Sequence, residues 1–128
     1  MHAVLGAYLF NRESQYGIHV YMSMRVKLSP RHFRVADICV IAGREPDEQI
    51  FTCAPFLWIE ILSTEDRMAD MSAKIDDLLG FGVHYVWLLD PRTKRAWVYT
   101  GEGITEVRDV LRTQNPDIMV PLSEITTS

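Results

Sequence analysis

With 128 residues, 48% of them hydrophobic and 23% charged, the chain has the size and composition of one globular domain. This composition excludes a disordered or collagen-like chain, and the lack of any run of about eighteen apolar residues excludes a membrane-spanning helix. A formal net charge of −4 argues against a protein that coats nucleic acid through bulk charge.

The N-terminal residues and the two cysteines indicate where the protein works. Residues 1–10 are mostly apolar, but no basic segment precedes them and no small-residue cleavage site follows, so we expect no signal peptide. Two cysteines do not make a disulfide framework in a chain that can bury a good core. We expect Cys39 and Cys53 to be reduced, with Cys39 buried in a strand, and the protein to be cytoplasmic.

The first half of the chain predicts a helix followed by three strands. Residues 2–12 place apolar side chains on one side of a short helix. Apolar and polar residues alternate over 18–28, which predicts a strand with one buried face. Residues 34–42 and 55–62 are each apolar on both faces apart from one acid, which is typical of interior strands covered on both sides.

The second half predicts a longer helix, a strand and a hairpin. We expect the helix over 63–81, where Ser63 and Asp66 resemble a capping box at its start. A strand over 83–89 follows, and residues 95–100 and 104–108 predict a hairpin around a glycine-rich turn. The remainder predicts a short strand and a terminal turn, so the chain reads as one α/β domain over 1–128 with a central mixed sheet.

Two acids interrupt the apolar strands, Asp37 in the second and Glu60 in the third. An ionised carboxylate buried without a partner costs several kcal/mol, so such residues need a reason. A polar segment follows each strand, so we expect both acids toward the carboxyl end of their strands. If the strands are neighbours, the carboxylates converge and a divalent cation would relieve their repulsion. The alternative is that each acid forms a private salt bridge or caps a loop.

A cluster of basic residues is the second candidate feature. Residues 14–36 contain no acid and hold Arg25, Lys27, Arg31 and Arg34. This pattern fits a solvated strand face, and it also fits a local strip that contacts phosphates on an otherwise acidic protein. The four histidines show no spacing that resembles a zinc site.

Four sequence blocks resemble a large bacterial restriction-endonuclease family within the PD-(D/E)XK nuclease superfamily. These blocks are 32–41 (HFRVADICVI), 56–67 (FLWIEILSTEDR), the helix over 70–82 that leads into FGV, and 85–91 (YVWLLDP). The similarity runs in order from residue 2 to about 122. The resemblance implies a restriction-endonuclease-like core whose acidic pair binds Mg²⁺ or Mn²⁺.

The resemblance also assigns roles to residues. It makes Asp37 the acid of the "PD" element and Glu60 the acid of "(D/E)XK", with the backbone carbonyl of Ile61 as a further metal ligand. Leu62 stands where the motif lysine would be, and in this family the matching lysine is Lys74 on the following helix.

Other positions match or depart from the family pattern. Arg25 matches a recurrent position, and Asp70 lies beside the shifted lysine in the i,i+4 arrangement of an ordinary surface ion pair. Ala36 replaces the usual proline, Leu78 a usual tyrosine, and Met24 a common polar residue. The N-terminal segment of longer relatives, with its extra acid, is absent from this sequence.

Two functions from different classes follow. The first is a metal-dependent endonuclease acting on DNA, in which Lys74 assists the reaction while Arg25, Lys27 and Arg34 contact phosphates. The second is a catalytically degenerate module of the same fold that binds nucleic acid or dimerises. In the first case we expect a homodimer, by analogy with nucleases that cut both strands, and we expect neither an organic cofactor nor a membrane.

Overall fold

Six strands form the central sheet of the computed structural model, which describes residues 1–126. The strands are β1 (Ile18–Ser29), β2 (His32–Ala42), β3 (Leu57–Ile61), β4 (Tyr85–Asp90), β5 (Arg95–Thr100) and β6 (Gly103–Val107). They are ordered in the sheet as in the chain; β3 and β4 are parallel, and every other neighbouring pair is antiparallel. The predicted α/β fold with a central mixed sheet is confirmed.

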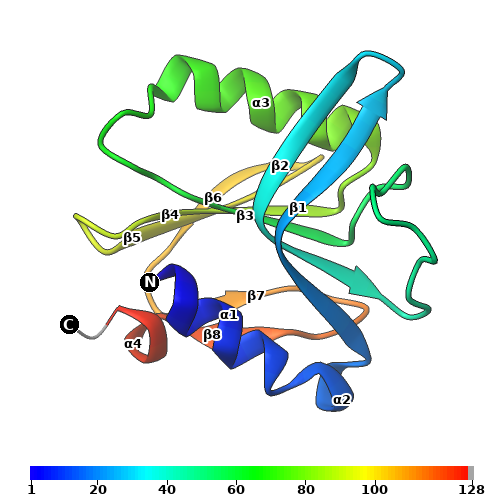
Figure 1. Ribbon diagram of the computed structural model, residues 1–128. Helices are drawn as coiled ribbons and strands as arrows, with labels where there is room; N and C mark the ends of the chain where they lie inside the picture. The colour runs from blue at the N-terminus through cyan, green and yellow to red at the C-terminus, as the bar shows by residue number, and fades with distance from the viewer. Residues whose placement is uncertain (127–128) are drawn as a thin grey trace.

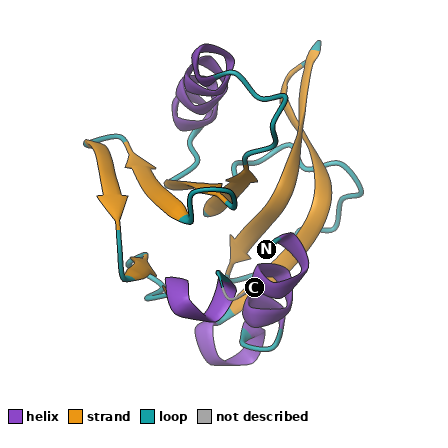
Figure 2. Ribbon diagram, turned by 90° about the vertical axis from the view of Figure 1, so that its left-hand side faces the viewer, coloured by secondary structure: helices purple, strands orange, loops and turns teal. Residues whose placement is uncertain are grey.

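Helices cover both faces of this sheet (Figures 1 and 2). Helix α3 (Met68–Phe81) lies on one face. The other face carries α1 (His2–Phe10), α2 (Glu13–Tyr16), α4 (Leu122–Ile125) and a small sheet of β7 (Val110–Arg112) with β8 (Met119–Pro121). Within residues 1–126, no helix has the length and apolar character needed to cross a membrane.

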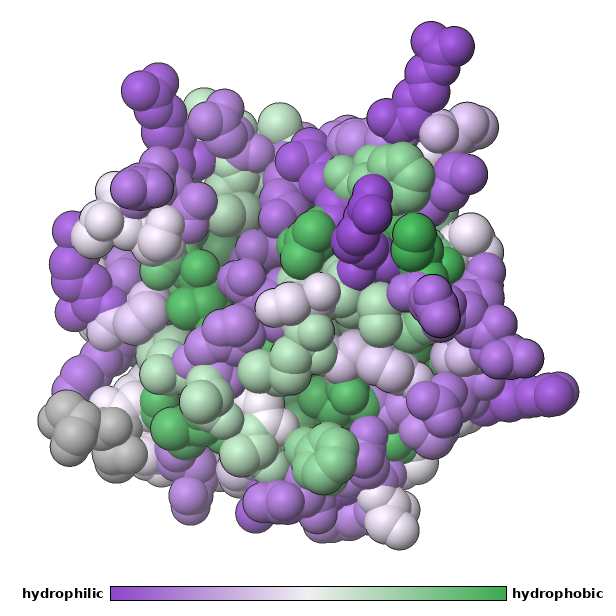
Figure 3. Space-filling model, viewed as in Figure 1, coloured by the Kyte–Doolittle hydropathy of each residue, from purple (hydrophilic) through white to green (hydrophobic). Residues whose placement is uncertain are grey.

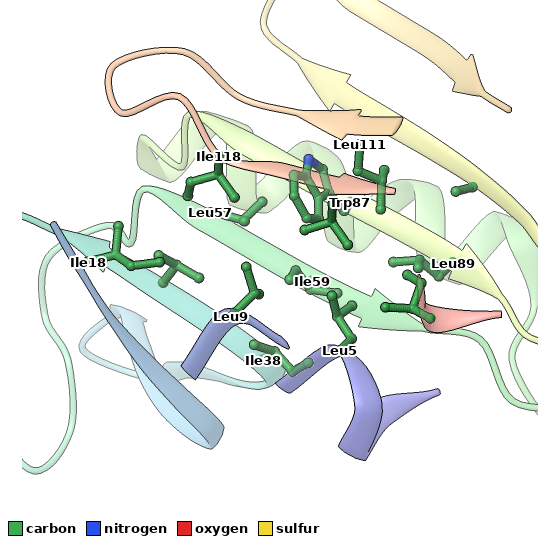
Figure 4. Close-up of a cluster of buried hydrophobic side chains, with 14 of the residues drawn as sticks. Leu5, Leu9, Ile18, Ile38, Leu57, Ile59, Trp87, Leu89, Leu111 and Ile118 are labelled. Carbon is green, nitrogen blue, oxygen red and sulfur yellow. The ribbon is translucent and has the colours of Figure 1, made fainter. Parts of the chain in front are cut away.

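Each face of the sheet has its own hydrophobic core. On the α1 side, fully buried Trp87 packs with Leu5 of α1 and Leu111 of β7 (Figure 4). On the α3 side, fully buried Trp58 packs with Ile75 of α3. The central strands are therefore buried on both sides, which explains why β3 and β4 are almost continuously apolar.

Strand β1 does not have the single buried face that its alternation predicts. Val20 packs with the core on the α1 side, whereas Met24 packs with the core on the α3 side. The change falls at Ser23, whose φ of 52° lies in the left-handed region and interrupts the regular alternation of side chains. On β2 the side changes at the matching place, because Ala36 belongs to the α3-side core and Ile38 to the α1-side core.

Helix α3 begins at Met68, five residues later than the sequence predicts. The expected capping-box residues do interact, since the backbone N–H and hydroxyl of Ser63 donate to Oδ2 of Asp66 at 2.8 and 3.2 Å. These bonds stabilise a turn before the helix. The carboxylate of Asp66 binds Ser63, and within residues 1–126 no side chain caps the first N–H groups of α3 itself. The prediction of a helix from Ser63 is therefore wrong at its N-terminal end.

Candidate metal and active site

The acids Asp37 and Glu60 lie on the neighbouring antiparallel strands β2 and β3. Ile38 of β2 pairs with Ile59 of β3. In an antiparallel register, the next position along brings Asp37 beside Glu60. The backbone N–H of Ile61 donates a 2.9 Å hydrogen bond to Oδ2 of Asp37, which ties this carboxylate to the carboxyl end of β3. Asp37 itself lies in the middle of β2, so its expected place toward the carboxyl end of its own strand is wrong.

Glu60 is a buried carboxylate with two strong donors. Its side chain lies on the α3 side of the sheet and the residue is only 5% exposed. The indole N–H of Trp58 and the ammonium group of Lys74 both contact its Oε1, each at 2.6 Å. Bonds of this kind, with ionised partners, are among the stronger hydrogen bonds in proteins. Lys74 therefore supplies much of the positive charge that makes an ionised Glu60 tolerable at this depth.

The electrostatics of Glu60 point to a shortage of positive charge. Burial raises the pKa of Glu60 above its usual value, because an ionised carboxylate is poorly solvated inside the protein; Lys74 and Trp58 oppose this rise. The charge of Asp37 adds to the rise, which means that the two carboxylates repel each other. A cation held near both acids would lower this repulsion.

A hollow of about 240 Å³ opens beside Glu60 and Lys74. Its lining contains four acids and three bases: Arg34, Glu60, Glu65, Asp66, Arg67, Asp70 and Lys74, together with Met71. This excess of acid favours a cation over a free phosphate group. We call this space the carboxylate hollow.

Asp70 and Lys74 of α3 do not form with each other the i,i+4 ion pair that their spacing in the sequence suggests. Asp70 lines the carboxylate hollow, but among residues 1–126 the ion-pair partner of Lys74 is Glu60. Lys74 thus faces the sheet and not its helix neighbour. The structure brings the shifted lysine to the acid of β3, although the two lie fourteen positions apart in the sequence.

The three basic residues expected to contact phosphates separate into two groups. Arg34 faces α3, because it pairs with Asp77 of that helix at 3.3 Å. Its partner in the β1–β2 register, Val26, belongs to the α3-side core, so it lies on the same face. Arg25 and Lys27 are offset by one position from Val26, so they lie on the opposite face of the hairpin. Arg34 therefore shares the carboxylate hollow with Lys74, while the other two bases are outside its lining.

Arg25 and Lys27 form a distinct surface with an aromatic residue. Phe33 is paired with Lys27 across the hairpin, and the guanidinium carbon of Arg25 lies 4.7 Å from the centre of its ring. The ammonium group of Lys27 lies 5.9 Å from the same centre. Phe33 is 38% exposed, so this face of the β1–β2 hairpin offers cations and an accessible ring together.

Two interactions at the site were not expected from the sequence. Trp58 could have been recognised, because it lies two residues before Glu60 and so shares its face of β3. His2 could not, because the fold brings α1 to β2, where Nε2 of His2 lies 3.0 Å from the backbone carbonyl oxygen of Asp37.

The oxygen donors predicted from the sequence are of the chemical type that a hard divalent cation takes. In residues 1–126 there is no group of three or more His, Cys, Asp or Glu side chains arranged to hold a metal. Asp37, Glu60 and the carbonyl of Ile61 offer oxygen donors of two carboxylates and one peptide group. Mg²⁺ is commonly held by one or two carboxylates plus water and substrate phosphate, whereas a closed zinc site needs four protein ligands.

A mixed sheet between helices, with one acid on each of two neighbouring strands and a lysine paired with one of these acids, is an arrangement typical of restriction-endonuclease-like proteins. The chain belongs to the Uma2 family, described as "Putative restriction endonuclease", whose model matches residues 1–126. It resembles the crystal structure of a putative nuclease belonging to DUF820 from Anabaena variabilis ATCC 29413. The TM-score is 0.77 at 20% identity, over 98% of this chain and 79% of that one. No curated protein matches the chain.

Proposed function

We propose that the protein is a metal-dependent endonuclease that hydrolyses phosphodiester bonds in DNA. The observation that carries the proposal is the buried Glu60–Lys74 pair with Asp37 on the adjacent strand. Burying charged groups costs free energy, and phosphodiester hydrolysis, the reaction that the family description implies, is one that uses such groups. Asp37, Glu60 and the carbonyl of Ile61 would hold Mg²⁺ or Mn²⁺.

A bound Mg²⁺ or Mn²⁺ would lower the pKa of a water molecule and neutralise charge on the phosphate. The chain's own residues position and stabilise the reacting groups. Lys74 is held against Glu60 by a 2.6 Å contact, so its ammonium group lies at the hollow where negative charge develops on the phosphate.

Arg34 adds a further donor at the same place. Its Nε is buried and has no hydrogen-bond partner in the part of the chain described here, while Nη2 pairs with Asp77. We infer that the guanidinium group of Arg34, which lines the hollow, contacts a phosphate of the bound strand, and that Nε gains a partner only if the side chain shifts when the strand binds. Asp70, on the rim of the hollow, would orient Lys74 or a water molecule.

The test is cleavage of supercoiled plasmid with Mg²⁺ or Mn²⁺ by the protein and by Asp37→Asn, Glu60→Gln and Lys74→Met. We expect each variant to lose at least about a hundredfold in rate, because each removes a metal ligand or a stabilising charge. Asp76→Asn is the matched control, since Asp76 is exposed on the same helix and outside the hollow. Cleavage that persists in the first two variants would refute the proposal.

The rival function is a binding module that has kept the fold without the reaction. The separation of Arg25 and Lys27 from the hollow favours it, because those two bases cannot serve a phosphate bound beside Lys74. Calorimetric titration with Mn²⁺ distinguishes the two. A nuclease should bind the cation in a manner that Glu60→Gln abolishes, and a module should not.

We also propose that the protein acts as a homodimer, by analogy with nucleases in which two copies supply one site for each strand of a duplex. Helix α1 offers a suitable surface: Val4 and Phe10 are 47% and 61% exposed, and Figure 3 shows apolar side chains gathered over the lower part of the face that carries α1. Sedimentation that gives a monomer at micromolar concentration would contradict the dimer.

A further inference from the structure

A second cavity lies at the opposite end of β3 from the carboxylate hollow. It has a volume of about 680 Å³. Phe56, just before β3, and Tyr85, the first residue of β4, form part of its wall, so it opens at the amino ends of these parallel strands. Glu60 is four positions after Phe56, which corresponds to about 13 Å along the strand. We call it the amino-end pocket.

Aromatic rings form one wall of the amino-end pocket. The rings of Phe56 and His84 have centres 5.7 Å apart and planes inclined by 32°, and Phe56 and Tyr85 lie 5.4 Å apart. Phe56 is buried, whereas His84 is exposed at the mouth. The hydroxyl oxygen of Tyr85 accepts a 3.1 Å hydrogen bond from the backbone N–H of Gln114, which fixes this ring in place. The wall therefore offers a rigid aromatic surface with one accessible ring.

Amide groups and a guanidinium group form the other wall. Gln114 and Asn115 line it from the β7–β8 connection, which reaches the end of β2 in Figure 1. The φ of Asn115 is 54°, and the hydroxyl of Thr113 donates to the carbonyl oxygen of Pro116 at 2.8 Å, so this turn is tightly held. Arg44 lines the pocket from the loop after β2.

The charge of this lining differs from that of the whole protein. The chain carries a net charge of −4, yet this pocket is lined by Arg44 and His84 and by no carboxylate. The adjoining loop holds three acids, Glu45, Asp47 and Glu48, and none of them lines the pocket; Glu45 accepts from the hydroxyl of Tyr21, and Glu48 accepts from the hydroxyl of Thr52. An anion entering the pocket therefore meets a guanidinium group without a competing acid in the wall.

We propose that the amino-end pocket binds one nucleotide, with its base on the ring of His84 and its phosphate on Arg44. Stacking on a flat ring suits any base, side-chain amides can pair with base edges, and a guanidinium group pairs with phosphate. An apolar ligand would leave the two amides and the guanidinium group unpaired, and a neutral sugar would leave the guanidinium group without an anionic partner. The ligand is either a free mononucleotide or an unstacked nucleotide of a DNA strand.

This site does not depend on the proposed cleavage reaction, and it is tested without metal. In EDTA, amide NMR spectra of the ¹⁵N-labelled protein are recorded with dAMP, dGMP, dCMP or TMP, for the native chain and for Glu60→Gln. We expect shifts confined to residues around Phe56, Tyr85 and Gln114 in both proteins. A failure here leaves the nuclease proposal intact, and inactive nuclease variants leave this one intact.

Three variants define the site. His84→Ala and Arg44→Gln should each weaken nucleotide binding by about five- to tenfold, since each removes a stacking or phosphate interaction. Arg92→Gln is the matched control, because Arg92 is equally exposed but follows the carboxyl end of β4. All three positions are on the surface, and retained spectra would show that each variant folds.

A single-stranded octamer and its duplex distinguish the two sources of the nucleotide. Stronger binding of the octamer than of mononucleotides, with the duplex weaker, would identify a DNA strand as the ligand; equal binding would identify free nucleotides. The proposal is overturned if no mononucleotide shifts these residues at millimolar concentration, or if His84→Ala and Arg44→Gln bind as well as the native chain.

Discussion

Two fully buried tryptophans on the central strands differ in what their indole N–H groups meet. Trp58 donates to Glu60 at 2.6 Å, whereas Nε1 of Trp87 is buried and has no partner in residues 1–126. A buried donor without a partner costs free energy, and a hydrogen bond to a charged acceptor stabilises more than a neutral one. The same substitution at the two positions therefore isolates the bond to Glu60.

We predict that Trp58→Phe lowers the free energy of unfolding by about 1.5–3 kcal/mol more than Trp87→Phe does. Both variants remove the same volume from a packed core, but only the first leaves Glu60 without its indole donor. Urea unfolding in EDTA measures both values. Equal decreases would show that the indole contributes nothing to holding the carboxylate, and that Lys74 alone does so.

The change of side within β1 is a property of the element and depends on one backbone conformation. Ser23 has a positive φ, which costs a side-chain-bearing residue about 1–2 kcal/mol. The paired strand β2 changes side between Ala36 and Ile38, so Asp37 lies at the crossover. We infer that Asp37, at this crossover, does not have to pack into either core, unlike its neighbours Ala36 and Ile38.

We predict that Ser23→Val destabilises the protein by about 1–2 kcal/mol, although valine favours strands, because a β-branched residue tolerates a positive φ poorly. Ser23→Gly should be no less stable than the native chain. Ser29→Val is the control, since Ser29 is exposed on the same strand and has no positive φ. Thermal unfolding would contradict the argument if both valine variants behaved alike.

Ser23 also shows why part of the architecture could not be predicted from the sequence. Hydrophobic periodicity locates some strands well, since β5 has the bounds expected from its pattern. Periodicity does not reveal which side of the sheet the apolar residues of a strand will face. The acids of β2 and β3 stand out because each interrupts an apolar run. Interactions made by tertiary packing, such as His2 against the carbonyl of Asp37, leave no local signal.

At the scale of the whole molecule, positive charge is concentrated on the β1–β2 hairpin. Four of the 13 basic residues lie in residues 14–36, which contain none of the 17 acidic ones. Figure 1 shows β1 and β2 running together beside α3, and Arg34 of the hairpin pairs with Asp77 of that helix. One face of the hairpin, with Arg25 and Lys27, is outside the carboxylate hollow, and the other brings Arg34 to it.

Because Arg25 and Lys27 lie outside the carboxylate hollow, we propose that they bind DNA phosphates at a distance from the reacting one. A basic side chain that binds a phosphate releases counterions, so removing one such side chain lowers the salt dependence of the binding constant by about one unit of slope. We predict that Arg25→Gln with Lys27→Gln weakens DNA binding at low salt and reduces that slope by about two. Fluorescence anisotropy with a labelled duplex over a salt series, in Ca²⁺ or EDTA, measures both.

The control and the opposing outcome follow from the position of the hairpin. Arg108→Gln removes an exposed base next to β6, at the opposite edge of the sheet, and should leave the slope unchanged. If the double variant kept the native slope while Arg34→Gln abolished binding, phosphates would be held only at the carboxylate hollow.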